Sequence, residues 1–346
     1  MVLYWSLIRD KKVNRDIRLD LLKALGVFCI ILAHCNPPQL IFQLRNFDVP
    51  LMVIISGTLF YHSFTRKPLS YGTYLKKRVL RLVPPVWIFL TFFFVSAYGI
   101  YHFAGQHFPF TVRQVVGSFL LLNGIGYVWI IKVFILVAAV SPAIYQLRKR
   151  LPNNTHFLGI LAGIYLLYEL SLLTLTKYLI AIPWLSVVIN YYLMYAIVYG
   201  CLAGLGMALH TLNKRERLMI AILCLGIFVA FSFNSFITLG YFIPTQEFKY
   251  PPRLYYLSYA LGISTFLYNF VDKLLIVFKQ KTVVDSIVFV SANSMWIYLW
   301  HILALHYWAK IFPNAYFLLT FLVVTVTAVA LTWIQILAQK KLTRQI

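Results

Sequence analysis

The stretch from Arg15 to Gly57 holds the residue types that could do chemistry within an otherwise apolar chain. Its first part, RLDLLKALGVFCIILAHC, opens with charged side chains and closes on His34. An ionisable group at the centre of a bilayer costs about 2.5–3.5 kcal/mol on insertion scales, so such groups are usually functional there. Because an imidazole takes up a proton near neutral pH, His34 is a candidate general base.

Ten residues separate Lys23 from His34. On a helix these two side chains share nearly one face and lie about 16 Å apart along the axis. Asp20 and Lys23 are spaced for an ion pair on the helix surface, although both could instead reach out to the membrane interface. For His34 the alternative role is a hydrogen bond between helices. We interpret the stretch as a site where a cytoplasmic anionic ligand binds at Lys23 and reacts at His34.

A second pair of cations follows a basic loop. Arg78 and Arg81 lie three residues apart, so both point one way from the start of a predicted helix. Two guanidinium groups can bind phosphates bidentately, and Arg18 could add a third cation. The alternative is anchoring to lipid phosphates. We expect Pro84 and Pro85 to break the helix and to turn both arginines into the bundle.

Composition places these residues in a membrane protein. Of the 346 residues, 61% are hydrophobic and 12% are charged, whereas a soluble domain has about 25% charged residues. We expect one all-α domain, a polytopic bundle over 19–338 between a basic cytoplasmic tail at 1–18 and a short one at 339–346, without a signal peptide. The ten apolar segments predicted to cross the membrane are 19–37, 46–64, 80–102, 127–147, 156–176, 184–208, 218–240, 254–271, 284–308 and 316–338.

The net charge of +22 follows the predicted topology. Most of the Lys and Arg side chains fall on alternate loops, which all face the cytoplasm if both termini lie there. The charge therefore predicts attraction to anionic membrane lipid and no nucleic-acid partner. Cys29, Cys35, Cys201 and Cys224 lack the spacing of metal ligands, so we expect no metal site.

The order of these motifs resembles the membrane-bound acyltransferase-3 family of bacterial integral acyltransferases. The family includes O-acetyltransferases of surface sugars, and the resemblance covers most of the chain. The matching pieces are Lys23-x10-His34, Ser56-Gly57, Arg78-x-x-Arg81, Trp129, Ser141-Pro142 and the run WIYLWH from Trp296 to His301.

The resemblance implies transfer of an acyl group, expected to be acetyl, from cytoplasmic acyl-CoA to a hydroxyl of a cell-surface polysaccharide or its lipid-linked precursor. The protein would lie in the bacterial cytoplasmic membrane, with acyl-CoA as a co-substrate and no bound cofactor. His34 is the implied catalytic residue. The implied acyl-CoA ligands are Lys23, Arg78 and Arg81, with Arg18 added by the charge argument above.

Several further residues are expected to support the site. Ser56 and Gly57 would either line the acyl channel or pack helices closely. Asp20 and Asp48 are supporting acids, and Asp48 could orient the imidazole. The lysine at position 23 replaces the more usual arginine of the family. Thr58 stands where the family usually has an aromatic residue.

The acceptor side has weaker candidates. Trp129, Tyr298 and His301 could line a cavity, although His301 could also be a buried hydrogen-bond partner. Lys132 is expected to face the interior, either in an ion pair with Glu169 or as a ligand-binding group. The predicted outer loop 241–256 has aromatic and polar side chains that suit a sugar, and an interfacial belt is the alternative.

We expect no appended hydrolase-like domain. The protein would then modify its acceptor directly or pass the acyl group to a separate extracytoplasmic transferase or polysaccharide synthesis complex. A transporter or flippase of sugars or lipid-linked glycans is the main alternative. Such a protein would be expected to show repeat-related halves, which the sequence does not reveal. A non-catalytic scaffold is the third class, and it would not need the imidazole.

Overall fold

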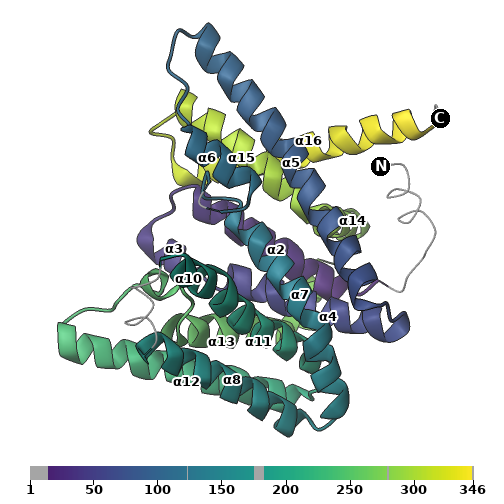
Figure 1. Cartoon of the computed structure of the whole chain (residues 1–346), viewed down its shortest axis with the longest axis vertical. Helices are drawn as coiled ribbons and strands as arrows, with labels where there is room; N and C mark the ends of the chain where they lie inside the picture. Colours follow the sequence, from purple (N-terminus) through teal and green to yellow (C-terminus); the bar gives the residue numbers. More distant parts are fainter. Residues whose placement is uncertain (1–14, 123, 175–182, 279, 345–346) are drawn as a thin grey trace. The chain divides into compact units, whose positions relative to one another are not determined.

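The computed structural model describes residues 15–122, 124–174, 183–278 and 280–344. Within these ranges the regular structure is helical, as Figure 1 shows, and no strand forms beyond one isolated bridge between Lys249 and Pro252. Most of the predicted basic tail, residues 1–14, lies outside the described residues. Internal contacts divide the chain into two compact units, one made of residues up to Pro37 and from Phe270 onward, the other of Pro38–Asn269. The expectation of one domain stays a prediction.

The first unit is built around one N-terminal helix. Helix α2 (Ile17–His34) begins after Asp16, whose side chain accepts a hydrogen bond from the Arg18 backbone and so caps the helix. It contacts α14 (Lys281–Ala292), α15 (Ser294–Ile311) and α16 (Phe317–Arg344). The chain bends by 81° between α14 and α15. At this bend, backbone N–H and C=O groups lose the hydrogen-bond partners that a continuous helix would provide.

The second unit contains the remaining elements. In chain order they are α3 (Gln39–Leu44), α4 (Asp48–Arg66), α5 (Tyr71–Phe103), α6 (Val112–Phe119), α7 (Trp129–Arg150), α8 (Asn154–Thr174), α10 (Pro183–Val188), the π-helix η1 (Ile189–Leu193), α11 (Met194–Leu209), α12 (Lys214–Leu239), the 3-10 helix η2 (Thr245–Phe248) and α13 (Leu254–Val277), in which the boundary between the units falls.

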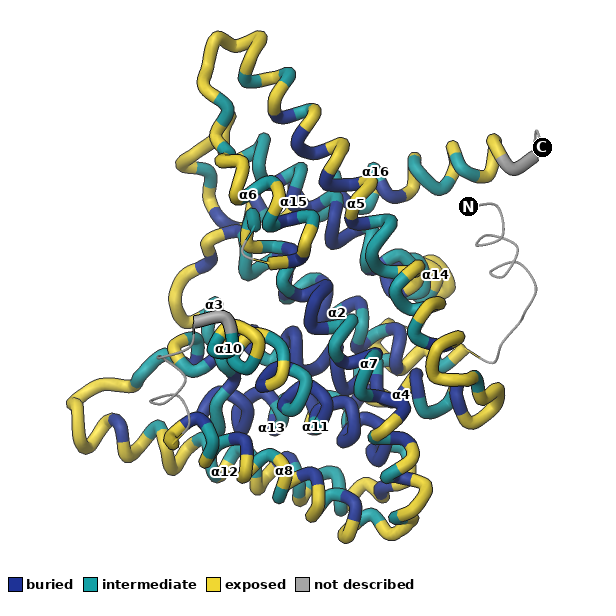
Figure 2. Tube along the Cα trace, in the orientation of Figure 1, coloured by how far each residue is buried: buried dark blue, intermediate teal, exposed yellow. Residues whose placement is uncertain are grey.

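Helices α4 and α11 form the tightest contact of this unit. A Cβ at Gly57 would lie 2.1 Å from the Ala203 carbonyl oxygen, and one at Gly206 would lie 2.0 Å from that of Ile54. Thr58 Oγ1 donates a hydrogen bond to the Gly206 carbonyl at 2.7 Å. Figure 2 shows α4 largely buried, whereas α12 is largely exposed. Gly57 therefore packs two helices backbone to backbone.

Eight helices of the described chain are long and apolar enough to cross a membrane, and there are nine such spans if the bent pair α14–α15 counts as one. Each corresponds to one of the ten predicted segments. The one remaining predicted segment, 19–37, corresponds to α2. This helix forms as expected, but its three charged residues, Arg18, Asp20 and Lys23, keep it out of that count. The protein is therefore a polytopic helical membrane protein.

The expected break at Pro84 and Pro85 is wrong. Helix α5 runs without interruption through both prolines. Each proline removes one hydrogen bond to a carbonyl four residues earlier, and those carbonyls belong to Leu80 and Arg81, which are exposed. The freed carbonyls lie next to Arg81 in the basic first part of the helix, where water at the headgroup level can solvate them. Val86 and Phe89, in the turn after the prolines, are buried, and their packing stabilises the uninterrupted helix.

Candidate functional site

His34 is the last residue of α2 and forms a pair with His301 of α15. Its Nδ1 lies 2.9 Å from His301 Nε2. The two ring planes are within 9° of parallel and the ring centres are 5.2 Å apart. Because the ring centres are much farther apart than the two nitrogens, the rings lie edge to edge and the hydrogen bond runs within both ring planes.

The backbone fixes which nitrogen of His301 bears the proton. His301 Nδ1 faces the Tyr298 carbonyl of the preceding turn, and a carbonyl can only accept a hydrogen bond. His301 is fully buried, where a neutral ring is strongly favoured over an imidazolium. A neutral ring with its proton on Nδ1 has its lone pair on Nε2. His34 Nδ1 must therefore donate to His301.

The same reasoning sets the tautomer of His34. With its proton on Nδ1, a neutral His34 has its lone pair on Nε2, the nitrogen that can take a proton from a reacting group. His301 thus fixes which nitrogen of His34 bears the lone pair. The sequence left two roles open for His301, an acceptor-side residue or a buried hydrogen-bond partner. The geometry agrees better with the buried hydrogen-bond partner. The Tyr298-x-x-His301 spacing put these two residues on one helix face, but no signal in the sequence pointed to the pair of His301 with His34.

The other end of α2 is anchored at the bend between α14 and α15. Lys23 Nζ donates to the Ser291 carbonyl at 2.8 Å. That carbonyl belongs to the last turn of α14, where backbone acceptors lack partners within the helix. Lys23 therefore has a capping role that exists without any ligand. Two contacts, Lys23–Ser291 and His34–His301, hold α2 against the bent pair.

The expected ion pair between Asp20 and Lys23 is absent from the described residues. Asp20 instead accepts hydrogen bonds from Arg15 at 2.5 and 2.9 Å and from Ser291 Oγ at 2.5 Å. A bidentate guanidinium binds a carboxylate more strongly than one ammonium can, which explains the outcome. Arg18 pairs with Asp16 at 2.7 Å and lies 3.9 Å from Asp272.

In the second unit, Arg78 and Arg81 do not share one environment. Arg78 is half-buried, with its guanidinium carbon 5.4 Å from the centre of the Tyr74 ring, whereas Arg81 is exposed. The expectation that both turn into the bundle is wrong for Arg81, because the helix that bears them continues straight past its prolines. Their role in binding acyl-CoA stays a prediction.

Asp48 lies in a fully buried polar cluster at the start of α4. Arg45 Nη1 donates to Asp48 Oδ2 at 2.8 Å, and Lys249 Nζ lies 3.6 Å from Oδ1. Lys249 also donates to Asn46 Oδ1 at 3.0 Å. Burial, with a smaller effect of Arg45, lowers the pKa of Lys249 to about 8, although Asp48 acts in the opposite direction. The prediction that Asp48 orients His34 stays a prediction.

The expected outer loop supplies part of this cluster. Thr245 of η2 is buried, accepts from Asn46 Nδ2 at 2.9 Å and donates to Gln43 Oε1 at 2.7 Å. Gln43 Nε2 and Gln246 Oε1 are buried polar atoms that have no hydrogen-bond partner among the described residues. The segment is thus anchored inward by polar contacts, a feature that its composition of Tyr, Pro and charged residues did not reveal.

The ion pair between Lys132 and Glu169, one of the two alternatives given above for Lys132, does not form among the described residues, and both side chains have other partners. Glu169 binds Arg253 at 3.1 Å. The Lys132 ammonium is buried over three tyrosine rings, those of Tyr191, Tyr192 and Tyr195, at 5.2–5.8 Å from their centres. The π-helix η1 precedes α11 here, and such irregular turns are frequent at functional sites.

Trp129 is the first residue of α7. Its ring meets the Tyr250 ring edge-on, with 5.2 Å between the ring centres. Trp129 thereby contacts the predicted outer loop 241–256, one candidate for the acceptor-binding segment. This contact is compatible with both the predicted acceptor-side role and simple packing, so the role stays a prediction.

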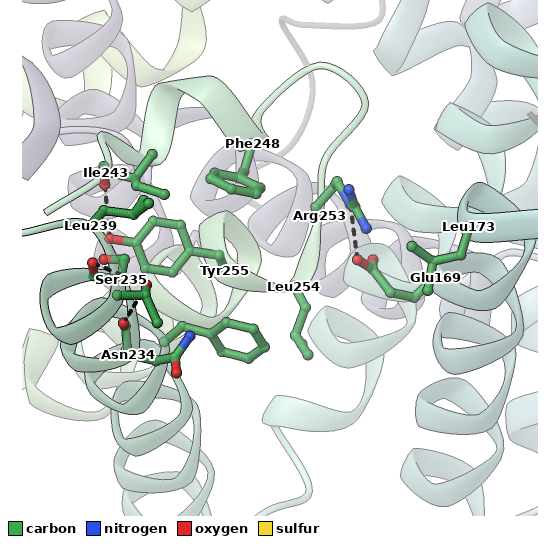
Figure 3. A pocket seen from close by; sticks show the side chains of 12 residues that line it. Glu169, Leu173, Asn234, Ser235, Leu239, Ile243, Phe248, Arg253, Leu254 and Tyr255 are labelled. Atoms are coloured by element: carbon green, nitrogen blue, oxygen red, sulfur yellow. Dashed lines mark hydrogen bonds and ion pairs between the residues drawn. The ribbon is translucent and has the colours of Figure 1, made fainter.

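A cavity of about 450 Å³ lies at one end of α8, α12 and α13, as Figure 3 shows. The pair Glu169–Arg253 forms one side of it, and side chains that include Ile243, Phe248 and Tyr255 form the other. Across the described residues no group of three His, Cys, Asp or Glu side chains is arranged to hold a metal ion.

Comparison with known proteins gives one match. A family model of the acyltransferase-3 type, described as an acyltransferase domain, matches residues 16–337. The chain belongs to the acyltransferase-3 family. This confirms the resemblance drawn from the motifs, and it makes the protein a multi-pass membrane O-acyltransferase. No curated protein and no solved structure matches the chain.

Proposed function

We propose that this acyltransferase-3 protein moves an acyl group, acetyl as the first expectation, from cytoplasmic acyl-CoA to a hydroxyl of a cell-surface polysaccharide or its lipid-linked precursor. Its setting would be the bacterial cytoplasmic membrane. The observation that supports this most is the in-plane hydrogen bond between His34 and His301. It leaves the lone pair of a neutral His34 on Nε2, the arrangement that a general base requires.

In the proposed reaction, His34 Nε2 takes the proton of the acceptor hydroxyl as that oxygen attacks the thioester carbonyl. A new C–O bond forms, the C–S bond breaks, and the CoA thiolate takes the proton back from the imidazolium. The products are an ester and free CoA. A two-step version, in which Nε2 itself is acylated first, uses the same nitrogen.

The donor would bind at the basic end of α2. Arg15, Arg18 and Lys23 lie at this end of the helix, where the two arginines also pair with Asp20 and Asp16. CoA carries several phosphate charges, which such a cluster would attract. Lys23 is already bonded to the Ser291 carbonyl, so a phosphate would add to that contact. By the motif that they match, Arg78 and Arg81 are also proposed acyl-CoA ligands.

One observation favours a second candidate function, transport of a sugar or lipid-linked glycan. The α14–α15 pair is bent by 81°, and broken helices near the membrane midplane are typical of transporter binding sites. His34 and His301 would then bind the substrate without a chemical step.

Membranes that contain the full chain, incubated with labelled acetyl-CoA and a polysaccharide precursor, would separate the two functions. An acyltransferase produces a time-dependent, alkali-labile labelled ester. A transporter moves the acceptor into or out of sealed vesicles and leaves it unlabelled. Mass spectrometry of surface glycans from cells with and without the protein would identify the acyl group and the sugar.

A further inference from the structure

The cavity beside Arg253 lies at the membrane interface. It is lined by the last turns of α8 and α12 and the first turn of α13, three of the helices that are apolar enough to span a membrane. Lys214, Arg215 and Arg217 mark the opposite end of α12. The positive-inside rule therefore puts the cavity on the outer side, at the level of the lipid headgroups.

Most of the cavity wall is apolar. Leu173, Phe231 and Leu239 line it and are each about half exposed. Exposed apolar side chains on a membrane-spanning helix face hydrocarbon. The cavity volume of about 450 Å³ lies within the usual range for a small-molecule site. A hydrocarbon chain could therefore enter from the bilayer without crossing a polar barrier.

The hydroxyl groups of the wall already have partners. Ser235 Oγ donates to the Ser232 carbonyl, Thr238 Oγ1 donates to that of Asn234, and Tyr255 Oη donates to that of Ile243. A sugar would find few unused hydroxyl groups here. The lining thus favours a ligand that is mostly hydrocarbon.

Arg253 is the exception. Its Nε donates to Glu169 at 3.1 Å, and the other oxygen of Glu169 accepts from Tyr165 at 3.0 Å. Within the described ranges the two terminal nitrogens of Arg253 donate no hydrogen bond, and the side-chain amide of Asn234 has no hydrogen-bond partner there either. Glu169 therefore holds the guanidinium by one edge and leaves its other donors available at the cavity.

We propose that this cavity binds a phosphodiester lipid, with the phosphate on Arg253 and Asn234 and the chain along Leu173, Phe231 and Leu239. A guanidinium binds two phosphate oxygens in a matched geometry. Because Glu169 already balances the charge of Arg253, a singly charged diester fits better than a doubly charged phosphate. Phosphates are the anionic groups available at headgroup level. Glycerophospholipids and glycosyl-phosphate polyprenols share this chemistry.

Native mass spectrometry of the full chain in detergent tests the site. The probes are phosphatidylglycerol and a polyprenyl phosphoglucose, with diacylglycerol and free polyprenol as neutral comparators. We expect one phosphodiester lipid to bind at least about tenfold more tightly than its neutral comparator. The tighter of the two phosphodiester lipids identifies the source. Equal binding of charged and neutral probes would overturn the proposal.

Two kinds of variant locate the binding. Arg253→Gln combined with Glu169→Gln removes both charges together and is expected to reduce phosphodiester binding to the level of the neutral probes. Leu239→Trp fills the cavity from its exposed rim, leaves Arg253 in place, and is expected to weaken every lipid probe. Arg113→Gln, which removes an exposed cation of α6 away from the cavity, is the matched control.

Unchanged binding in both Leu239→Trp and the double variant would refute the site. Thermal unfolding of each variant separates loss of binding from loss of fold. His34→Ala is expected to bind the phosphodiester lipid as the wild type does. The lipid-binding result can therefore be interpreted even if the proposed catalytic role of His34 is wrong.

Discussion

Replacing His301 by Phe removes the acceptor that fixes the tautomer of His34. The ring of phenylalanine fills the buried space, but His34 Nδ1–H loses its partner at 2.9 Å. A hydrogen bond of this kind stabilises by about 1 kcal/mol, and leaving the half-buried Nδ1–H of His34 unsatisfied costs at most about 3 kcal/mol, the upper value for a fully buried donor. His34 can escape that cost by moving its proton to Nε2, and it then loses the lone pair needed for proton removal.

The expected size of the effect follows from these energies. At about 1.36 kcal/mol per tenfold change in rate, a loss of 1–3 kcal/mol lowers kcat by roughly 5- to 150-fold. This is smaller than the roughly 10²- to 10⁴-fold loss expected for His34→Ala, which removes the base itself. The KM for acyl-CoA should change little, because His301 is proposed to act on the base and not on the donor.

The assay is transfer of labelled acetyl from acetyl-CoA in membranes, measured as kcat and KM separately. His301→Gln retains a side-chain acceptor and should recover part of the activity. His306→Phe, on the same helix, is the control for replacing a histidine by an aromatic ring. The reasoning is refuted if His301→Phe stays within about twofold of the wild-type kcat, or if it lowers kcat no more than the control does.

Three further predictions concern the second unit. Gly57→Ala should destabilise the protein by about 1–3 kcal/mol, because the new Cβ would lie 2.1 Å from a backbone oxygen of α11. Lys249→Met should flatten the pH dependence of stability. Burial lowers the pKa of Lys249 to about 8 from 10.5, so the unfolded state binds more protons between these values. Wild-type stability should therefore rise with pH across that window, by on the order of 3 kcal/mol. Arg78→Ala should raise the KM for acyl-CoA more than Arg81→Ala does, because only Arg78 is half-buried.

Each of these has a measurement and a contrary result. Thermal unfolding should separate Gly57→Ala from Gly72→Ala, where a Cβ meets nothing within 4 Å; equal midpoints would contradict the tight contact. Unfolding at a series of pH values should show a shallower dependence of stability on pH for Lys249→Met than for the wild type. An equal dependence in the two proteins would contradict the prediction for Lys249. Binding of labelled acyl-CoA that is the same in both arginine variants and the wild type would remove them from the donor site.

The sequence was sufficient for the helices but not for the contacts between them. Long apolar stretches bounded by charged loops allow few structures in a bilayer, so the ten predicted segments each correspond to a helix or a bent pair. Pro84 and Pro85 misled the prediction, because the effect of a proline depends on whether the freed carbonyl is solvated and whether the next turn is well packed.

Partner choice was the less predictable part of the site. Spacing along a helix predicted an ion pair between Lys23 and Asp20, but Asp20 accepts hydrogen bonds from Arg15 and Ser291 Oγ instead. A pairing between residues 267 positions apart, as for His34 and His301, leaves no periodic trace in one chain. The residue types therefore indicated the chemistry, whereas the tautomer that allows it required three-dimensional coordinates.

The central claim is that His34 removes the proton of the acceptor hydroxyl. The most direct measurement compares label transfer from acetyl-CoA to the polysaccharide precursor in membranes that contain equal amounts of wild-type protein or His34→Ala. We expect a time-dependent, alkali-labile ester with the wild type and at least about a 100-fold slower reaction with the variant, although both bind acyl-CoA equally. Transfer by His34→Ala at the wild-type rate would contradict it.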